Sequence, residues 1–366
     1  MRVGVPKEIK VHEYRVGLVP ASVAELTAAG HDVIVETKAG TGIDFSDQDY
    51  VNVGATIAAD AAEVFAKADM IVKVKEPQAQ EIALLEPRHL LFTYLHLAPN
   101  PEQTNGLMAS GATCIAYETV TSDSGALPLL KPMSEVAGRM SIQVASHYLE
   151  KEQGGRGELL GGVPGVAPCK VAILGGGVAG INAAQMATGQ RADVTIYDIS
   201  NERLAELDMH FGSQIKTAYA SKSAVAEAIR RSQVVIGAVL VPGAAAPKLV
   251  TRDQLKTMMR GSVLVDIAID QGGCFETSKP TTHSDPVYEI DGVIHYCVAN
   301  MPGAVARTSA FALNNATLPF VLKLANKGAE AAMAADPHLA AGLNVSGGKI
   351  RHQAVAEALG LPYEPA

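Results

Sequence analysis

The feature that most constrains the fold is a glycine-rich turn between an apolar segment and an alanine-rich one. Val171–Leu174 runs directly into Gly175-Gly176-Gly177-Val178-Ala179-Gly180, and Ile181–Ala187 follows with helical composition. A G-x-G-x-x-G turn between a strand and a helix is typical of a dinucleotide-binding βαβ unit. Gly175 permits the tight turn, Gly177 lets backbone N–H groups approach a pyrophosphate, and Gly180 lets helix and strand pack closely. The start of the helix stabilises phosphate charge.

A second expected strand, Asp193–Asp198, supports this interpretation. It ends in an acidic residue about 20 residues beyond the glycines, where a carboxylate binds the ribose 2′-hydroxyl. Asp198 therefore favours NAD over NADP, because a 2′-phosphate would meet like charge. Arg203 is the opposing feature, since it can pair with a phosphate or cover the adenine. The alternative interpretation of the glycine segment is an ordinary turn between a strand and a helix that binds no nucleotide.

Strands and helices alternate along the rest of the chain, which predicts α/β architecture with parallel sheets covered by helices. The expected strands are Arg2–Pro6, His31–Glu36, Met70–Val74, His89–Leu95 and Thr113–Thr119, then Val171–Leu174, Asp193–Asp198, Val234–Ala238, Ser262–Ile269 and His295–Val298. A long helix is expected from Met133 or Ser134 to Glu152, followed by a Gly/Pro-rich boundary up to Pro168. Another is expected at Leu313–Lys327, and the tail to Ala366 reads as helical.

We therefore expect two doubly wound domains linked by long helices. A Rossmann domain over 129–305 is inserted in a flavodoxin-like parallel-sheet domain made of 1–128 and of a helical return over 306–366.

Composition and charge exclude several classes of protein. With 48% hydrophobic and 19% charged residues the chain can fill large cores, so it is neither disordered nor fibrous. The net charge of −8 and the absence of a Lys/Arg cluster predict no nucleic-acid or membrane-surface partner. The longest apolar stretch, Val234–Pro247, is too short and too broken to span a bilayer.

The four cysteines, Cys114, Cys169, Cys274 and Cys297, form no CxxC pair, so we expect buried thiols and no metal site. Disulfides or zinc are the alternative. With no signal peptide at Met1, the expected location is the cytoplasm.

Single polar residues interrupt or end several apolar segments. Open α/β sheets bind their ligands at the carboxyl ends of the strands, so the residues at the ends of these segments are candidates for a site. Lys73 and Lys75 lie on a buried-looking strand, which tolerates a lysine only at an edge or beside an anion. His96 follows Leu90–Leu95 and is suited to proton transfer near neutrality. Asp270 follows Val263–Ile269. Each has an ordinary structural alternative, such as a solvent-reaching lysine or a hydrogen-bonded loop histidine. From position alone, a surface location is favoured for Arg15 over a substrate contact, and a structural hydrogen-bonding role for Asp266 stands as an equal alternative to a functional one.

Seven segments in order, spread from end to end, resemble the alanine dehydrogenase/nicotinamide nucleotide transhydrogenase family. They are Val5-Pro6-Lys7-Glu8 with Glu13-Tyr14-Arg15-Val16, Val72-Lys73-Val74-Lys75-Glu76-Pro77, Leu95-His96-Leu97-Ala98, Pro132-Met133-Ser134-Glu135-Val136-Ala137-Gly138-Arg139, the glycine turn, Val265 to Gly273, and Tyr296-Cys297-Val298-Ala299-Asn300-Met301-Pro302.

The resemblance implies roles for these positions. Arg15 would bind the substrate carboxylate as a planar fork of donors, and Lys75 would contact the carboxylate or carbonyl oxygen. His96 would be the general acid/base and Asp270 a catalytic carboxylate facing the cofactor. NAD would be held by a larger set: Ser134, Gly175, Gly177, Val178, Ala179, Gly180, Asp198, Arg203, Val239, Leu240, Ile267, Ala268, Ile269, Asp270, Lys279, Val298, Ala299, Asn300 and Met301. Family members often carry serine where this chain has Ala220, which calls into question a hydroxyl contact to the adenosine there.

The implied reaction is the reversible oxidative deamination of L-alanine to pyruvate and ammonium with NAD, in a homohexamer. Leu130 and Met133 would contact the substrate methyl group. The sequence leaves three alternatives: the NAD(H)-binding subunit of a transhydrogenase, a non-catalytic NAD-binding module, and a relative that uses saccharopine or another amino acid.

Overall fold

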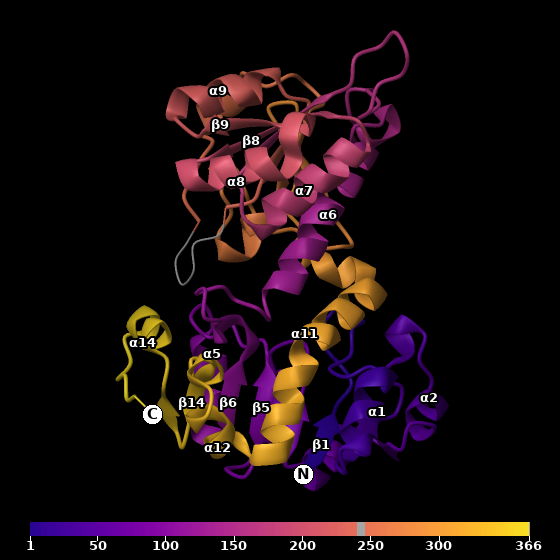
Figure 1. Cartoon of the computed structure of the whole chain (residues 1–366), viewed down its shortest axis with the longest axis vertical. Coiled ribbons are helices and arrows are strands. Elements are labelled where there is room, and N and C mark those ends of the chain that lie inside the picture. Colours follow the sequence, from indigo (N-terminus) through magenta and orange to yellow (C-terminus); the bar gives the residue numbers. More distant parts are fainter. Residues whose placement is uncertain (240–245, 366) are drawn as a thin grey trace. The chain divides into compact units, whose positions relative to one another are not determined.

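The computed structural model describes residues 1–239 and 246–365, which fall into two compact units (Figure 1). Unit 1 comprises Met1–Met133 and Val305–Ala366, and unit 2 comprises Ser134–Ala304. Unit 2 is therefore inserted within unit 1 along the sequence. The chain leaves unit 1 within the long helix α6 (Lys131–Tyr148) and re-enters it just before the long helix α11 (Ala306–Lys327).

Unit 1 is built on an eight-stranded sheet of order β15-β14-β6-β5-β4-β1-β2-β3. Its strands are β1 (Arg2–Val5), β2 (Asp32–Glu36), β3 (Thr56–Ala58), β4 (Met70–Val72), β5 (Leu90–Thr93), β6 (Thr113–Ala116), β14 (Leu343–Ser346) and β15 (Lys349–Ile350). Strands β1 to β6 are mutually parallel. The run β2-β1-β4-β5-β6 has the expected flavodoxin-like order when the short β3, which the sequence did not reveal, is left out. With β3 at the edge, the six parallel strands have the order β3-β2-β1-β4-β5-β6, which is that of a Rossmann sheet.

Helices cover this sheet through an aliphatic core. The α-helices are α1 (Pro20–Ala28), α2 (Asp47–Val51), α3 (Ala61–Lys67), α4 (Ala79–Ile82), α5 (Pro101–Ser110), α11, α12 (Ala329–Ala334), α13 (Pro337–Ala340) and α14 (Gln353–Leu359), with short 3₁₀ turns η1 (Thr41–Ile43) and η2 (Tyr117–Thr119). One cluster joins Phe65 of α3 and Leu107 of α5 to Ile71, Leu91 and Val345 of the sheet. Alternating strands and helices thus bury the apolar runs that the sequence displays.

The expectation of a helical tail is wrong in part. After α13 the chain forms β14, which pairs antiparallel with β6, and β15, which pairs antiparallel with β14. Helix α11 also begins at Ala306, well before the expected Leu313. Both strands are short: β14 is a strand because it pairs with β6, which is remote in sequence, and β15 because it forms a hairpin with β14.

Unit 2 has a seven-stranded sheet of order β12-β13-β11-β10-β7-β8-β9. Its strands are β7 (Lys170–Leu174), β8 (Asp193–Asp198), β9 (Lys216–Tyr219), β10 (Val234–Gly237), β11 (Val263–Asp266), β12 (Val287–Ile290) and β13 (Val293–Tyr296). All pairs are parallel except β12 with β13. The parallel strands follow the order of a Rossmann dinucleotide-binding sheet, as expected. The expected strand Ser262–Ile269 is shorter, because a 3₁₀ turn, η5 (Ile267–Gln271), follows Asp266.

Besides α6, the described part of unit 2 contains the helices α7 (Val178–Gly189), α8 (Asn201–Phe211), α9 (Lys222–Arg231) and α10 (Arg252–Leu255). Further 3₁₀ turns are η3 (Lys151–Gln153), η4 (Gly212–Gln214) and η6 (Met301–Val305). Helix α9 packs on the sheet through Val225 and Ile229, against Val235 and Leu264. Helix α7 lies against β7 and β8, and α6 packs so closely on α7 that a Cβ at Gly138 would stand 2.2 Å from the carbonyl oxygen of Ala179.

The four cysteines are buried free thiols, as the sequence predicts. Within the described ranges, no helix combines the length and the apolar character needed to cross a membrane.

The glycine turn yields a stability prediction. A Cβ at Gly180 would stand 1.9 Å from the carbonyl oxygen of Gly175, whereas one at Gly189, in the same helix, meets nothing within 4 Å. Gly180→Ala should lower the free energy of unfolding by about 1–3 kcal/mol, because helix and strand must separate. Gly189→Ala should leave it unchanged or raise it by up to about 1 kcal/mol. Urea unfolding followed by circular dichroism measures both, and equal effects would contradict the packing role of Gly180.

Candidate functional site

Three of the predicted site residues lie in connections that follow strands of the unit 1 sheet, all at the same edge. Arg15 lies in the connection after β1, Lys75 follows β4, and His96 follows β5. Strands β1, β4 and β5 are parallel neighbours, so their carboxyl ends open on the same edge. The strand order thus places the connections that carry these three residues at one edge of the sheet.

Arg15 is buried, with a relative exposure of 2%, which corrects the surface position inferred from its sequence context alone. Its Nε and Nη2 donate to the Glu13 carboxylate at 2.6 and 2.5 Å, and Nη1 contacts the Met133 sulfur at 3.0 Å. Burial opposes the charge of Arg15, but the hydrogen bonds and charge of Glu13 raise its pKa above the usual value. The guanidinium is therefore a fixed cation.

Lys75 differs from Arg15 because its ammonium has no hydrogen-bond partner in the part of the chain that the structure describes. Only its backbone is held: its carbonyl accepts from Thr93 Oγ1 at 3.0 Å, and its N–H lies 3.4 Å from Glu8 Oε1. The side chain is half-buried. A half-buried cation without a bonded carboxylate is suited to binding an anion.

His96 is held by its backbone and presents its ring to solvent. Its φ of 48° is in the left-handed region, and its N–H donates to Glu118 Oε1 at 2.6 Å. Nδ1 lies 3.9 Å from the same carboxylate oxygen, and the ring stacks on Tyr94 with centroids 5.7 Å apart. The side chain is 44% exposed, so the imidazole can exchange protons.

Two apolar residues expected near the substrate methyl group, Leu130 and Met133, stand near the end of the first segment of unit 1. Met133 is buried against Arg15, and Leu130 is half-buried. Tyr94 bonds the carbonyl of the adjacent Leu129 at 2.5 Å, which ties this segment to the strand that carries His96.

In unit 2 the glycine turn has the geometry of an anion-binding helix start. Gly175 has a φ of 106°, which only glycine adopts readily. Gly177 precedes the first residue of α7, and a Cβ there would meet nothing within 4 Å. The N-terminus of α7, with Val178, Ala179 and Gly180, is thus open at its first turn, as a bound pyrophosphate requires.

Asp198 ends β8 beside this turn. Its Oδ2 accepts from the N–H of Gly176 at 2.7 Å and its Oδ1 from the N–H of Ser200 at 2.9 Å. Arg203 donates to the carbonyl of Gly176 at 2.7 Å and to Glu206 at 2.5 Å. The carboxylate is thereby fixed at the tip of β8, where a ribose would lie.

Asp270 is exposed within η5, at the carboxyl end of β11. The preceding Asp266 is fully buried and accepts from the N–H groups of Ala268 and Cys274 at 3.0 and 2.9 Å and from the Ser278 hydroxyl. Burial raises the pKa of Asp266, while these donors oppose the rise. Asp266 is therefore structural, as its place in the strand suggested, and it closes the loop that carries Asp270.

Most of the other predicted cofactor residues also follow strand ends of unit 2. Val239 comes after β10; Ile267, Ala268 and Ile269 come after β11; Val298, Ala299, Asn300 and Met301 come after β13; Ser134 lies in α6, and Lys279 stacks its ammonium 4.3 Å from the Tyr288 ring centre. Leu240 lies outside the described residues. Ala220 donates its N–H to the carbonyl of Asp198 at 2.9 Å. Strands β7, β8, β10, β11 and β13 are parallel, so the predicted residues that directly follow β10, β11 and β13 share one edge of the sheet, whereas Ser134 and Lys279 do not follow the end of a parallel strand.

Sequence reasoning missed the carboxylates that hold the unit 1 residues. Glu13 binds Arg15, Glu118 binds the backbone of His96, and Glu8 and Glu81 bind the buried Lys73. A signal existed for Lys73, since a lysine within a buried strand requires an anion, and this expectation is confirmed. Nothing in the sequence connects Glu118 to His96, because they lie on different strand ends.

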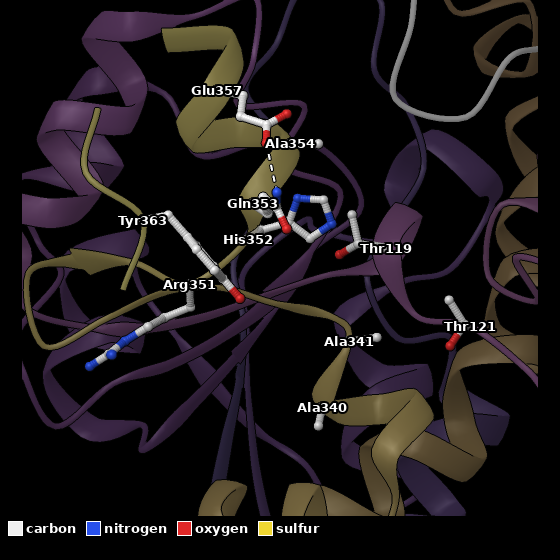
Figure 2. A pocket seen from close by; sticks show the side chains of 10 residues that line it. All are labelled: Thr119, Thr121, Ala340, Ala341, Arg351, His352, Gln353, Ala354, Glu357 and Tyr363. Atoms are coloured by element: carbon white, nitrogen blue, oxygen red, sulfur yellow. Dashed lines mark hydrogen bonds between the residues drawn. The ribbon is translucent and has the colours of Figure 1, made fainter. Parts of the chain in front are cut away.

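A cavity of about 540 Å³ opens elsewhere in unit 1 (Figure 2). Its lining includes Thr119, Tyr363 and residues of α14, where Gln353 donates to Glu357 at 2.7 Å. None of the sequence-predicted site residues lines it. In the described ranges, no three His, Cys, Asp or Glu residues are grouped to hold a metal ion.

A dinucleotide-type Rossmann sheet in one unit and a cationic, imidazole-bearing strand edge in the other define a nucleotide-dependent oxidoreductase. Two family models divide the chain between them: the alanine dehydrogenase/PNT N-terminal domain matches residues 4–137, and the corresponding C-terminal domain matches residues 141–353. The chain belongs to the alanine dehydrogenase/PNT family.

Individual relatives agree with this assignment over the full length. An alanine dehydrogenase of Halomonas elongata is 61% identical, covering 100% of this chain and 99% of the relative. The solved structure of an L-alanine dehydrogenase superposes with a TM-score of 0.95 at 52% identity, covering 98% of this chain and 99% of the other. A transhydrogenase from Sinorhizobium meliloti is more distant, with a TM-score of 0.81 at 27% identity, 97% of this chain and 100% of the other being covered.

The buried Glu13–Arg15 pair yields a pH-dependent stability prediction. Arg15 holds the pKa of Glu13 below its usual range despite burial. The pair therefore contributes fully above the unfolded-state pKa of about 4.3, and the contribution is lost as the pH falls through the lower folded-state pKa. Glu13→Gln should reduce the free energy of unfolding by about 3 kcal/mol at pH 7.

At acidic pH the difference between Glu13→Gln and the unmodified protein should shrink. Urea titrations at pH 7 and pH 3 measure it. The control is Glu25→Gln, at an exposed position of α1, which should have little effect at either pH. A loss for Glu13→Gln that is the same at both pH values would contradict the charge pairing.

Proposed function

We propose that this chain catalyses the NAD-dependent, reversible oxidative deamination of L-alanine to pyruvate and ammonium. The observation that carries the proposal is the single edge of the unit 1 sheet that presents a buried guanidinium, a half-buried ammonium and an exposed imidazole. Two cations can bind a small amino acid through its carboxylate, and an imidazole can move a proton near its Cα. The names of the full-length relatives supply the particular substrate.

In this proposal Arg15 and Lys75 bind the substrate carboxylate. Arg15 is held rigidly by Glu13, so little conformational entropy is lost when it binds. Lys75 supplies the second cation and stabilises negative charge that develops on oxygen. Leu130 and Met133 are apolar, so they would contact the substrate methyl group and their side chains would offer no polar partner to a larger polar substrate side chain.

NAD fits the open first turn of α7 and the carboxylate at the tip of β8, and it supplies an acceptor for the hydride that leaves Cα. Gly175, Gly177, Val178, Ala179 and Gly180 would bind the pyrophosphate, and Asp198 the ribose 2′-hydroxyl. The remaining predicted residues, Ser134, Arg203, Val239, Leu240, Ile267, Ala268, Ile269, Lys279, Val298, Ala299, Asn300 and Met301, would complete the binding surface.

His96 and Asp270 would carry the proton transfers that follow. Loss of hydride leaves an imine conjugated to the carboxylate, and His96 removes a proton from the water that adds to the imine carbon. Asp270 orients that water and the departing ammonia, and His96 then assists collapse of the carbinolamine to pyruvate.

Two other functions are open to test. The distant likeness to a transhydrogenase favours hydride exchange with a second nucleotide, although that protein is less similar than the alanine dehydrogenases. A non-catalytic NAD-binding module would explain unit 2 but gives no reason for the cations of unit 1.

A homohexamer in the cytoplasm is part of the proposal, and four buried free thiols suit a reducing compartment.

The proposal predicts formation of NADH from NAD and L-alanine. We expect absorbance at the NADH band to rise with L-alanine and much less with bulkier amino acids, and NADP to be a poor substitute for NAD because of Asp198. Hydride transfer from NADH to an NADP-loaded partner without alanine-dependent NADH formation would favour the transhydrogenase function. NADH binding without either reaction would favour the binding module.

A second prediction concerns His96. His96→Ala should lower turnover by about 10²–10⁴-fold, the usual contribution of a general acid/base, while the Kd for NADH, measured by fluorescence, stays unchanged. Because His96 has a positive φ, His96→Asn is the companion variant, since asparagine tolerates this conformation. His147→Ala, at a histidine 51% exposed on α6, is the control. Turnover of both His96 variants near that of the control would remove His96 from the mechanism.

A further inference from the structure

A lysine whose side chain is completely buried lies two residues before Lys75. The ammonium of Lys73 donates to Glu81 Oε1 at 2.6 Å and to Glu8 Oε2 at 3.2 Å. All three side chains are at most 2% exposed. They form a closed buried triad of two carboxylates and one ammonium.

Stability alone does not explain this triad. Removing three charges from water costs several kcal/mol per ion, and apolar side chains of similar volume are often as stabilising or more so. Burial opposes the ionised forms of Glu8 and Lys73. It raises the pKa of Glu8, whereas the two neighbouring carboxylates outweigh burial and raise the pKa of Lys73. Stability therefore gives no general reason to prefer three buried charges over apolar packing, and the role of the triad in the site has to follow from its contacts.

The other oxygens of the two carboxylates show what the triad does. Glu8 Oε1 accepts from the N–H of Val74 at 2.7 Å and lies 3.4 Å from the N–H of Lys75. Glu81 Oε2 accepts from the N–H of Gln78 at 2.8 Å, at the start of α4. The backbone on both sides of Lys75 is thus bonded to carboxylates whose positions Lys73 fixes.

The opposite side of the same segment is also held. Thr93 of β5 donates its hydroxyl to the carbonyl of Lys75. The main chain at Lys75 is therefore fixed from Glu8 and from β5, while its ammonium is left without a hydrogen bond in the described chain. This is the arrangement expected of a side chain that is aimed at a ligand by its backbone.

We propose that Glu8, Lys73 and Glu81 are positioning residues that direct the Lys75 ammonium toward the carboxylate of the substrate. The inference rests on the proposed role of Lys75 in substrate binding. The triad should therefore affect the affinity for pyruvate, the 2-oxo acid of the proposed reaction. It should not affect the affinity for NADH, because the triad belongs to unit 1 alone.

The deciding variant removes all three charges together: Glu8→Gln, Lys73→Met and Glu81→Gln in one chain. This leaves no unpaired buried charge, so the fold should be kept. The KM for pyruvate should rise about tenfold or more, since small displacements of a positioning contact have large effects. The KM for NADH should stay unchanged, and kcat should change less than the KM for pyruvate.

A matched control is Lys67→Met with Glu63→Gln, which removes an exposed ion pair of α3 and should change none of these constants. If the triple variant does not fold, Glu81→Gln alone keeps the Lys73–Glu8 pair, and the same selective rise in the KM for pyruvate, of smaller size, is expected.

A folded triple variant, or failing that a folded Glu81→Gln variant, with an unchanged KM for pyruvate would overturn the inference. A parallel rise in the KM values for pyruvate and NADH would also overturn it, because that is the result of a general structural role. The proposed function fails separately, if the unmodified protein does not oxidise NADH in the presence of pyruvate and ammonium.

Discussion

Pairing of buried charges at the carboxyl ends of β1 and β4 is the interaction on which the candidate site depends. Two cations, Arg15 and Lys73, are removed from water, and each is bonded to carboxylates that are equally buried. Without Glu8 and Glu81 the Lys73 ammonium would lose its proton or turn outward, since an isolated buried charge is unstable. Arg15 keeps its charge, so without Glu13 its guanidinium would turn outward. Arg15 and Lys73 are thus occupied by carboxylates. Lys75, at the same edge, has an ammonium that bonds no carboxylate in the described chain.

The same strand order performs a different task in each unit. Reading only parallel strands, unit 1 has β3-β2-β1-β4-β5-β6 and unit 2 has β9-β8-β7-β10-β11-β13. In such sheets the carboxyl ends of the strands gather the loops on one edge, and the reversal of order beside the first strand opens a crevice there. At that edge unit 1 carries paired buried charges, whereas unit 2 carries the glycine turn and carboxylates held by N–H groups, Asp198 and Asp266. Side chains at the strand ends, and not the topology, separate substrate chemistry from nucleotide binding.

Local features were readable from the sequence, and non-local pairings were not. The glycine turn, the strand ending at Asp198 and the need of Lys73 for an anion follow from short segments, and all three are present in the structure. The burial of Arg15 was not predictable from its context, because Glu13 acts only once the β1 loop is packed against Met133. Glu118 and His96 meet through neighbouring strand ends, and β14 and β15 exist only through pairing with β6 and with each other. Such contacts are set by the assembled sheet and leave no periodic signal in the sequence.

Arg203 could favour NADP by pairing with a 2′-phosphate, and the position of its side chain bears on the choice between NAD and NADP. A 2′-phosphate needs a cation free to bind it in place of a carboxylate. Arg203 instead donates to the backbone carbonyl of Gly176 and to Glu206, while Asp198 is held by the N–H groups of Gly176 and Ser200. To accept NADP the chain would have to break both arrangements and place two negative charges side by side. The hydrogen bonds around Gly176 therefore favour NAD, because they fix the carboxylate in place and engage the one nearby arginine that would otherwise offset it.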